Sequence, residues 1–409
     1  MNQLERETLA NLLPNAKYRS AFVISRGSLP DELFADIQTD NCVKVLVAGQ
    51  RGMGKTTELR RLEALLKEST DYYPIFLQFG AEEKIDDVSL IHSMAQALIA
   101  GSGLKPKKGS TIDKWFTREE IVSSYAESVG GDASLRASFY FVTAGGGIKS
   151  SRDLRKTATE TVVKKKADLV QAFNEVVAEA NKVTERQAVF IVDDIDKIQD
   201  ADSVETTFIS SAQLLGSLDA PCVFTVPYTY ATSSLIRIAS LPYQNIHRVP
   251  AIGIVDERGA SVTEQLSFLV ELMQRRIKID IFSVQQLKRI GEDSGGVIVD
   301  ALRLARGVTK QKILSADSTV DDLIESEMQK LVDEYRYQLD APILWQKIQK
   351  FCTTNDAQMF LIDELTIDML CKMIVIEYRQ QKIWYNIHPA VRKLYEQNKD
   401  YLDVHLPTS

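Results

Sequence analysis

Cysteine is scarce in this sequence of 409 residues, and long apolar runs are lacking. The 4 cysteines form no CxxC pair and match no zinc-site spacing, which indicates reduced thiols rather than a disulfide framework or a metal cluster. No run approaches the roughly 18 apolar residues that span a bilayer, and residues 1–10 have no apolar signal-peptide core. These absences predict a cytoplasmic protein with no membrane partner.

Neither sign of charge dominates the sequence. It has 49 Lys and Arg against 56 Asp and Glu, a net charge of −7, and 44% of its residues are hydrophobic, which excludes a disordered chain. The mildly acidic total excludes coating of nucleic acid through bulk charge, although a local patch could still bind it. At about 150 residues per domain, the length predicts two or three domains.

One segment has the pattern of a phosphate-binding loop. Residues 43–48 form an apolar run typical of a buried parallel strand, a GxxxxGKT motif follows, and leucines then recur at helical spacing in residues 58–66. Glycines let the backbone N–H groups turn inward toward phosphates, and a helix N-terminus favours negative charge. Lys55 would then reach the β- and γ-phosphates of ATP, and the Thr56 hydroxyl would bind Mg²⁺. The predicted nucleotide-binding residues are Gly49, Gln50, Arg51, Gly52, Met53, Gly54, Lys55, Thr56 and Thr57.

A second buried-strand run, residues 188–192, ends in two aspartates. A carboxylate at the tip of a strand beside the loop can hold the magnesium ion, and we assign Asp193 to the metal through a water molecule. Asp194 is the candidate base that orients the attacking water. Many ATPases of this kind have Glu at the second position. Because Asp194 is one methylene shorter, we expect slow hydrolysis.

These motifs resemble the P-loop ATPases of the AAA+ and STAND branches. The apolar run 222–228 is similar to their sensor-1 strand, which would place Thr225 near the γ-phosphate; an ordinary buried Thr in a strand is the alternative. Residues 73–79 and 245–252 are also expected to be strands. Strands that alternate with helices predict a parallel sheet with helices on both faces.

A helical lid and a winged helix are expected after this core. Apolar residues at helical spacing predict helices over 262–277, 284–292, 297–315 and 320–339. Residues 295–303 occupy the place of the AAA+ sensor-2 helix or the STAND Gly-Leu-Pro segment but match neither. Arg303 could substitute for the sensor-2 arginine, or it could be a solvated helical Arg. Arg237 and Arg248 are candidates for contact with the γ-phosphate of a neighbouring subunit.

The C-terminal part predicts a helix at 367–374 and a wing hairpin from strands 375–379 and 382–386. The following Ile-His-Pro-x-Val string resembles the Met-His-Asp motif of STAND proteins. The resemblance implies that His388 contacts the β-phosphate of ADP and holds a closed state. A structural histidine at a helix start is the alternative.

The sequence therefore predicts an α/β fold: a parallel-sheet P-loop core over residues 1–258, a helical lid over 259–339 and a winged helix over 340–409. Residues 104–166 are a predicted insertion, with 13 Lys and Arg against 7 Asp and Glu. This basic segment, which includes Trp115 and Phe116, could be a solvated arm, a protein-contact surface or a nucleic-acid contact. The predicted winged helix is charge-balanced, which weakens a DNA role for it.

The resemblance implies an ATPase that binds ATP/ADP and Mg²⁺ and acts as a nucleotide-dependent switch. Such a switch would form homo-oligomers or control a separate effector or sensor protein, since the repeat array of STAND proteins is missing here. Antiviral defence is a context in which compact ATPases of this kind occur. The alternative is a DNA-loading ATPase similar to origin-recognition or transposition-regulator proteins. A degenerate scaffold that binds ATP without cleaving it is a third hypothesis, although the intact Lys55, Thr56 and Asp193 argue against loss of binding.

Overall fold

The computed structural model describes most of the chain in two compact units. The described residues are 1–13, 24, 27–80, 85–117, 166–198, 201–232, 242–315, 317–339, 341–354, 363–380 and 382–405. One unit comprises residues 28–48 and 58–248, and the other comprises 1–27, 49–57 and 249–409. The loop of the GxxxxGKT motif therefore groups with the C-terminal part of the chain. The domain limits 1–258, 259–339 and 340–409 stay predictions.

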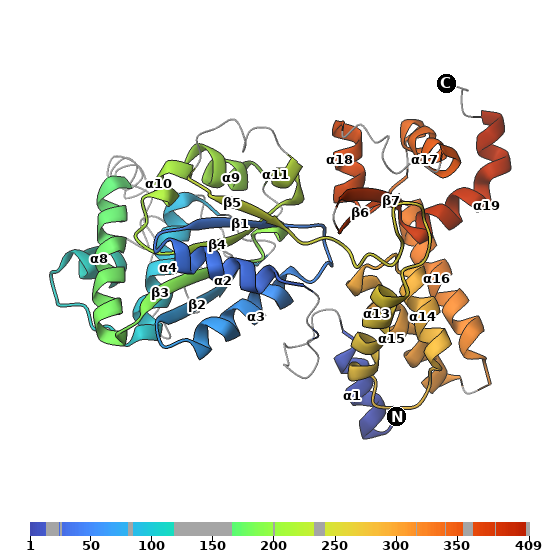
Figure 1. Cartoon of the computed structure of the whole chain (residues 1–409), viewed down its shortest axis with the longest axis horizontal. Helices are drawn as coiled ribbons and strands as arrows, with labels where there is room; N and C mark the ends of the chain where they lie inside the picture. The colour runs from blue at the N-terminus through green and yellow to red at the C-terminus, as the bar shows by residue number, and fades with distance from the viewer. Residues whose placement is uncertain are drawn as a thin grey trace, which may run out of the picture. The chain divides into compact units, whose positions relative to one another are not determined.

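The first unit contains a five-stranded parallel sheet with the order β2-β3-β4-β1-β5 (Figure 1). This confirms the predicted parallel α/β core. β1, β4 and all but the first residue of β3 are fully buried, as expected for strands covered on both faces. The strands are β1 (Lys44–Ala48), β2 (Tyr72–Gln78), β3 (Gln187–Asp193), β4 (Cys222–Val226) and β5 (Asn245–Arg248).

Helices cover both faces of this sheet. α4 (Asp87–Ser102) and α8 (Lys166–Thr184) pack on the face formed by Leu46, Phe190 and Phe224. α2 (Leu29–Thr39) and α3 (Lys55–Glu68) contact the other face, where the Arg60 guanidinium lies 3.4 Å from the ring centroid of Phe76. The shorter elements are η2 (Asp113–Thr117), η3 (Ile195–Lys197), α9 (Ala201–Glu205), η4 (Thr206–Ser210), α10 (Ala212–Gly216) and α11 (Tyr228–Thr232).

The second unit begins with a packed group of helices that confirms the predicted helical region. α13 packs on α14, α15 packs on α16, and the N-terminal helix α1 lies against α15. The Arg306 Nε donates to the Leu9 carbonyl across this last contact. The helices are α1 (Gln3–Asn11), α13 (Thr263–Arg276), α14 (Val284–Asp293), α15 (Ile298–Leu314) and α16 (Val320–Arg336).

The C-terminal elements have the composition of a winged helix: two helices, an antiparallel hairpin and a final helix. They are α17 (Pro342–Thr354), α18 (Glu364–Cys371), β6 (Val375–Arg379), β7 (Ile383–Ile387) and α19 (Pro389–His405). The helix expected over 367–374 is shifted: it ends at Cys371 because the chain turns through Met373 at φ +61° to enter β6. Pro389 occupies the first position of α19, where its missing N–H costs nothing.

The structure describes only the two ends of the basic insertion. Within them, Phe116 is 2% exposed and belongs to the sheet core, and Trp115 packs against that core, so Phe116 cannot stack on a nucleic-acid base. Lys166 pairs with Asp87 at 2.5 Å. Residues 118–165 lie outside the described residues. Among the described helices, each is too short or too polar to cross a bilayer.

Candidate nucleotide-binding site

The loop between β1 and α3 has the backbone that a phosphate-binding loop requires. Gly52 and Gly54 have φ values of +82° and +88°, a region that side chains disfavour. Lys55 begins α3 and is 7% exposed. Its ammonium donates to the carbonyls of Gly49 at 2.7 Å and Gln50 at 3.0 Å. The predicted phosphate-binding lysine is thus held on the carbonyl groups of its own loop.

The start of α15 packs directly on this loop. The Val299 N–H donates to the Gly52 carbonyl at 3.3 Å. A Cβ on Gly52 would lie 3.0 Å from that of Val299, and one on Gly54 would lie 3.3 Å from the Ile298 Cδ1. Glycine is therefore needed here for close packing as well as for its φ values. The segment that the resemblance assigns to sensor 2 contacts the loop through apolar side chains.

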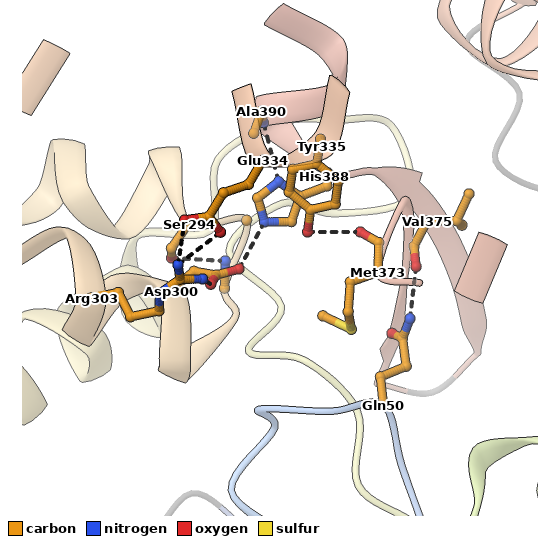
Figure 2. Close-up of polar contacts among 12 residues, drawn as sticks. Gln50, Ser294, Asp300, Arg303, Glu334, Tyr335, Met373, Val375, His388 and Ala390 are labelled. Carbon is orange, nitrogen blue, oxygen red and sulfur yellow. Dashed lines mark hydrogen bonds and ion pairs between the residues drawn. The ribbon is translucent and has the colours of Figure 1, made fainter. Parts of the chain in front are cut away.

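Gln50 connects the loop to the winged helix. Its side chain is buried, and its amide Nε2 donates to the carbonyls of Leu370 and Val375, each at 2.7 Å. Its Oε1 accepts the N–H of Glu377, also at 2.7 Å. Figure 2 shows the Gln50 side chain directed at β6. The motif gave no signal for this contact, because the second position of GxxxxGKT accepts any side chain.

The two predicted aspartates lie at the end of β3. Asp193 is 1% exposed, and its Oδ1 accepts the N–H of Asp194 at 2.8 Å. Asp194 has φ +69°, an uncommon value for a non-glycine residue, of the kind that clusters at functional sites. Its carboxylate pairs with Lys197 at 2.6 Å and accepts from the Gln78 amide at 3.3 Å. The sequence did not predict Lys197 or Gln78 as a partner of Asp194.

Thr225 supports the turn that holds these aspartates. Its side chain is fully buried on β4, and its Oγ1 accepts the Ile195 N–H at 3.1 Å. Val47 on β1 is its register partner. Because β1, β3 and β4 are parallel, the end of β1, Thr225 and Asp193 come to one edge of the sheet.

The arginine candidates are placed differently. Arg248 ends β5 at the same sheet edge, opposite Ala48, and is half-buried. Arg237 lies outside the described residues. Arg303 forms a two-pronged pair with Glu334, with both Nη2–O distances at 2.7 Å, and lies 3.5 Å from Asp300. Arg303 is therefore a helical Arg at the surface, 44% exposed and ion-paired to α16, while a sensor-2 role for it stays a prediction.

His388 is fully buried where the winged helix meets the helical region (Figure 2). Its Nε2 lies 3.2 Å from the Asp300 Oδ2, and its Nδ1 accepts the Ala390 N–H at 3.1 Å. Its ring centroid lies 4.9 Å from that of Tyr335, whose hydroxyl donates to the Met373 carbonyl. Both ring nitrogens thus have protein partners, and Asp300 is a partner that sequence reasoning missed.

Each unit by itself offers groups of the kind that bind a magnesium nucleotide. Asp193, Asp194 and Asp196 offer carboxylate oxygens that lie within 4.8 Å of one another, the hard ligands that Mg²⁺ prefers. The loop offers glycine-rich backbone and a lysine at a helix start. Bound Mg²⁺ would supply charge neutralisation for the phosphates. The roles predicted for Thr56, Asp193, Asp194 and Thr225 stay predictions.

No protein-family model and no curated protein matches the chain. Similar solved structures include the Orc1 protein of Aeropyrum pernix in complex with DNA, at 12% identity, TM-score 0.43 and 98% coverage of both chains. Another is Cdc6p from Pyrobaculum aerophilum, at 13% identity and TM-score 0.38, covering 95% of this chain and 98% of that one. Likeness at this level is too low to carry an argument about activity or partners. The fold assignment rests on the parallel sheet, the helical region and the winged-helix elements described above.

Proposed function

We propose that this chain is a Mg²⁺-dependent ATPase that binds ATP on the Gly49–Thr57 loop, hydrolyses it slowly and acts as a nucleotide-dependent switch. One observation carries the proposal. The loop that continues from β1 has Gly52 and Gly54 at positive φ and a lysine at a helix start, and Asp193 and Thr225 lie at the sheet edge where β1 ends. The loop also contacts the lid and the winged helix directly.

Each residue then has a stated task. The loop N–H groups and Lys55 hold the phosphates, Thr56 and Asp193 hold the metal, and Asp194 orients the attacking water. Asp194 is paired with Lys197 and lies in a left-handed turn, which supports slow hydrolysis because its carboxylate is already engaged. We expect turnover below about 1 s⁻¹, the lower end of the usual enzyme range.

Binding of a fluorescent ATP analogue with Mg²⁺ tests the site. Lys55→Ala should weaken binding about 100-fold, because a charged hydrogen-bond donor to phosphate is lost. Asp193→Asn should reduce Mg²⁺-dependent hydrolysis while nucleotide binding without metal stays within about threefold. Lys67→Ala, on the same helix and 61% exposed, is the matched control and should behave as the parent. Parent-like binding by Lys55→Ala would contradict the proposed site. Binding without any turnover would favour the non-hydrolysing scaffold.

The output of the switch is tested by measuring molecular size with ADP and with a non-hydrolysable ATP analogue. Growth only with the ATP analogue supports a switch that self-assembles or exposes a partner surface. A nucleotide can shift the equilibrium only through different contacts in the two states. Unchanged size, with no partner released, would argue against a switch.

A DNA-loading ATPase is the second candidate function. The chain has a P-loop core, then a helical region, then a winged helix. Origin-recognition and transposition-regulator ATPases share this order, and the resemblance supports loading as an alternative. The same sizing experiment in the presence of duplex DNA separates the two candidates. Assembly that requires DNA, with binding that weakens steeply with salt, supports loading.

A further inference from the structure

The edge of β6 that faces away from β7 is buried, and the Gln50 side chain bonds to its main chain. β6 pairs with β7 on one side, and on its other side Tyr378 forms an isolated parallel bridge with Ala251. On that side, the Val375 carbonyl and the Glu377 N–H point outward, and the Gln50 amide bonds to both of them. An amide that donates to one residue and accepts from the next but one imitates a neighbouring strand, so it satisfies main-chain groups that would otherwise be unpaired.

Two further contacts fix the same edge. The second Gln50 donor bonds to the Leu370 carbonyl at the end of α18, so the Gln50 side chain also reaches the helix that precedes the hairpin. The Ala251 N–H donates to the Glu377 carbonyl at 3.1 Å, beside the Gln50 contact. Since Gln50 is 3% exposed, water does not compete for these bonds.

The main chain of Gln50 is held by the predicted phosphate-binding lysine. The Lys55 ammonium donates to the Gln50 carbonyl at 3.0 Å and to the Gly49 carbonyl at 2.7 Å. We expect a lysine that turns to a phosphate to leave these neutral carbonyls, because a charge-assisted bond between two ions is the stronger one. One residue therefore receives the lysine through its backbone and holds the winged helix through its side chain.

We infer that Gln50 is a latch that transmits nucleotide occupancy of the loop to the winged helix. With Lys55 on the loop carbonyls, the latch is closed and β6 is held. When Lys55 engages phosphate, the Gln50 carbonyl and the neighbouring Gly49 carbonyl each lose a hydrogen bond, and the Gln50 amide releases β6 and α18. This inference rests on the proposed function for its nucleotide step, but the closed latch itself does not.

Hydrogen–deuterium exchange of the Glu377 amide measures the latch directly. Without nucleotide, Gln50→Leu should raise the exchange rate of a peptide over residues 374–379 by about tenfold, since the Glu377 N–H loses its acceptor. Gln338→Leu is the matched control, because Gln338 is exposed; it should exchange as the parent does. ATP with Mg²⁺ should raise the exchange of the parent toward the level of Gln50→Leu and should change that of Gln50→Leu little. Should Gln50→Leu fail to fold, Gln50→Asn retains the amide but is one methylene too short to reach all three partners.

The outcomes separate the latch from the ATP site when analogue binding is measured on the same samples. Equal exchange in the parent and Gln50→Leu without nucleotide would overturn the latch. If the parent binds ATP and its β6 exchange does not change, the transmission step is wrong while the ATP site stands. If the parent binds no ATP, the proposed function and the nucleotide coupling both fall, and the nucleotide-free comparison still decides whether Gln50 holds β6.

Discussion

His92 in α4 shows how one buried residue makes stability depend on pH. Its ring centroid lies 5.4 Å from that of Phe116, and its side chain is 5% exposed. Burial lowers the pKa of its imidazole from 6.5 to about 4, against a smaller opposing effect of a backbone hydrogen bond at Trp115. The neutral ring is therefore the form that the folded state favours.

We predict that His92→Gln removes this pH dependence. As the pH falls from about 6.5 to 4, the unfolded parent binds a proton at His92 that the folded parent does not bind. The free energy of unfolding of the parent therefore falls by roughly 3 kcal/mol, and that of the variant does not fall for this reason. Urea unfolding at about pH 7 and pH 4.5 measures the difference. Burial raises the pKa of Asp293 to about 6, which gives a dependence of opposite sign, but it is common to both proteins and cancels. Identical pH slopes would refute the prediction.

At the scale of single residues, the motif predicted the backbone conformation of the loop but not the hydrogen-bond partners of its side chains. Glycines at 52 and 54 and a lysine at 55 follow from the local geometry that a phosphate-binding loop needs. The partners of Gln50 did not follow, because Glu377 lies 327 positions away. Lys44 is a similar case: its ammonium is buried in the sheet and donates to three carbonyls, an arrangement that an apolar strand pattern does not predict.

The elements were predicted well where one local pattern sets both ends. β1, β3, β4 and the hairpin strands were predicted to within about two residues, because apolar runs bounded by polar residues mark buried strands. The strand expected over 245–252 is shorter and ends at Arg248, since Pro250 has no N–H to continue the ladder. The predicted end of α18 was wrong for a tertiary reason: Ile374 is needed at the start of the hairpin, where its carbonyl accepts the His388 N–H.

The contact between α15 and the segment after β5 makes a prediction at this scale. Gly296 has φ +78°, and a Cβ there would lie 2.0 Å from the Ile252 carbonyl oxygen. Gly259, in the same unit, has φ +81° but nothing within 4 Å. Gly259→Ala should lower the free energy of unfolding by about 1–2 kcal/mol, because its backbone is left-handed. Gly296→Ala should lower it by at least about 2 kcal/mol more, because the new Cβ clashes with the Ile252 carbonyl oxygen. Urea unfolding of the two variants measures this difference. Equal decreases in the free energy of unfolding would show that only backbone strain contributes.

At the scale of the whole molecule, His388 joins the winged helix to α15 and α16 through its contacts with Asp300 and Tyr335. We predict that His388→Ala lowers the free energy of unfolding by about 2–4 kcal/mol without any nucleotide, because a buried ring is lost and Asp300 loses a partner. Thermal unfolding with and without ADP is the measurement. His247→Ala is the comparison, since the His247 side chain is 15% exposed and lies 2.8 Å from Asp36. This substitution should lower the free energy of unfolding by less than His388→Ala does. Loss of ADP stabilisation with unchanged nucleotide-free stability would instead favour the β-phosphate role.

The sequence by itself determined the parallel α/β core, the loop conformation and the carboxylates at the end of β3, because each depends on neighbours within a few residues. Only the tertiary structure decided which elements the loop contacts. Lys55 on its own carbonyls, Gln50 on β6, and His388 between Asp300 and Tyr335 are contacts that single positions do not encode. They arise when packing brings distant segments together and leaves buried polar groups that must find partners.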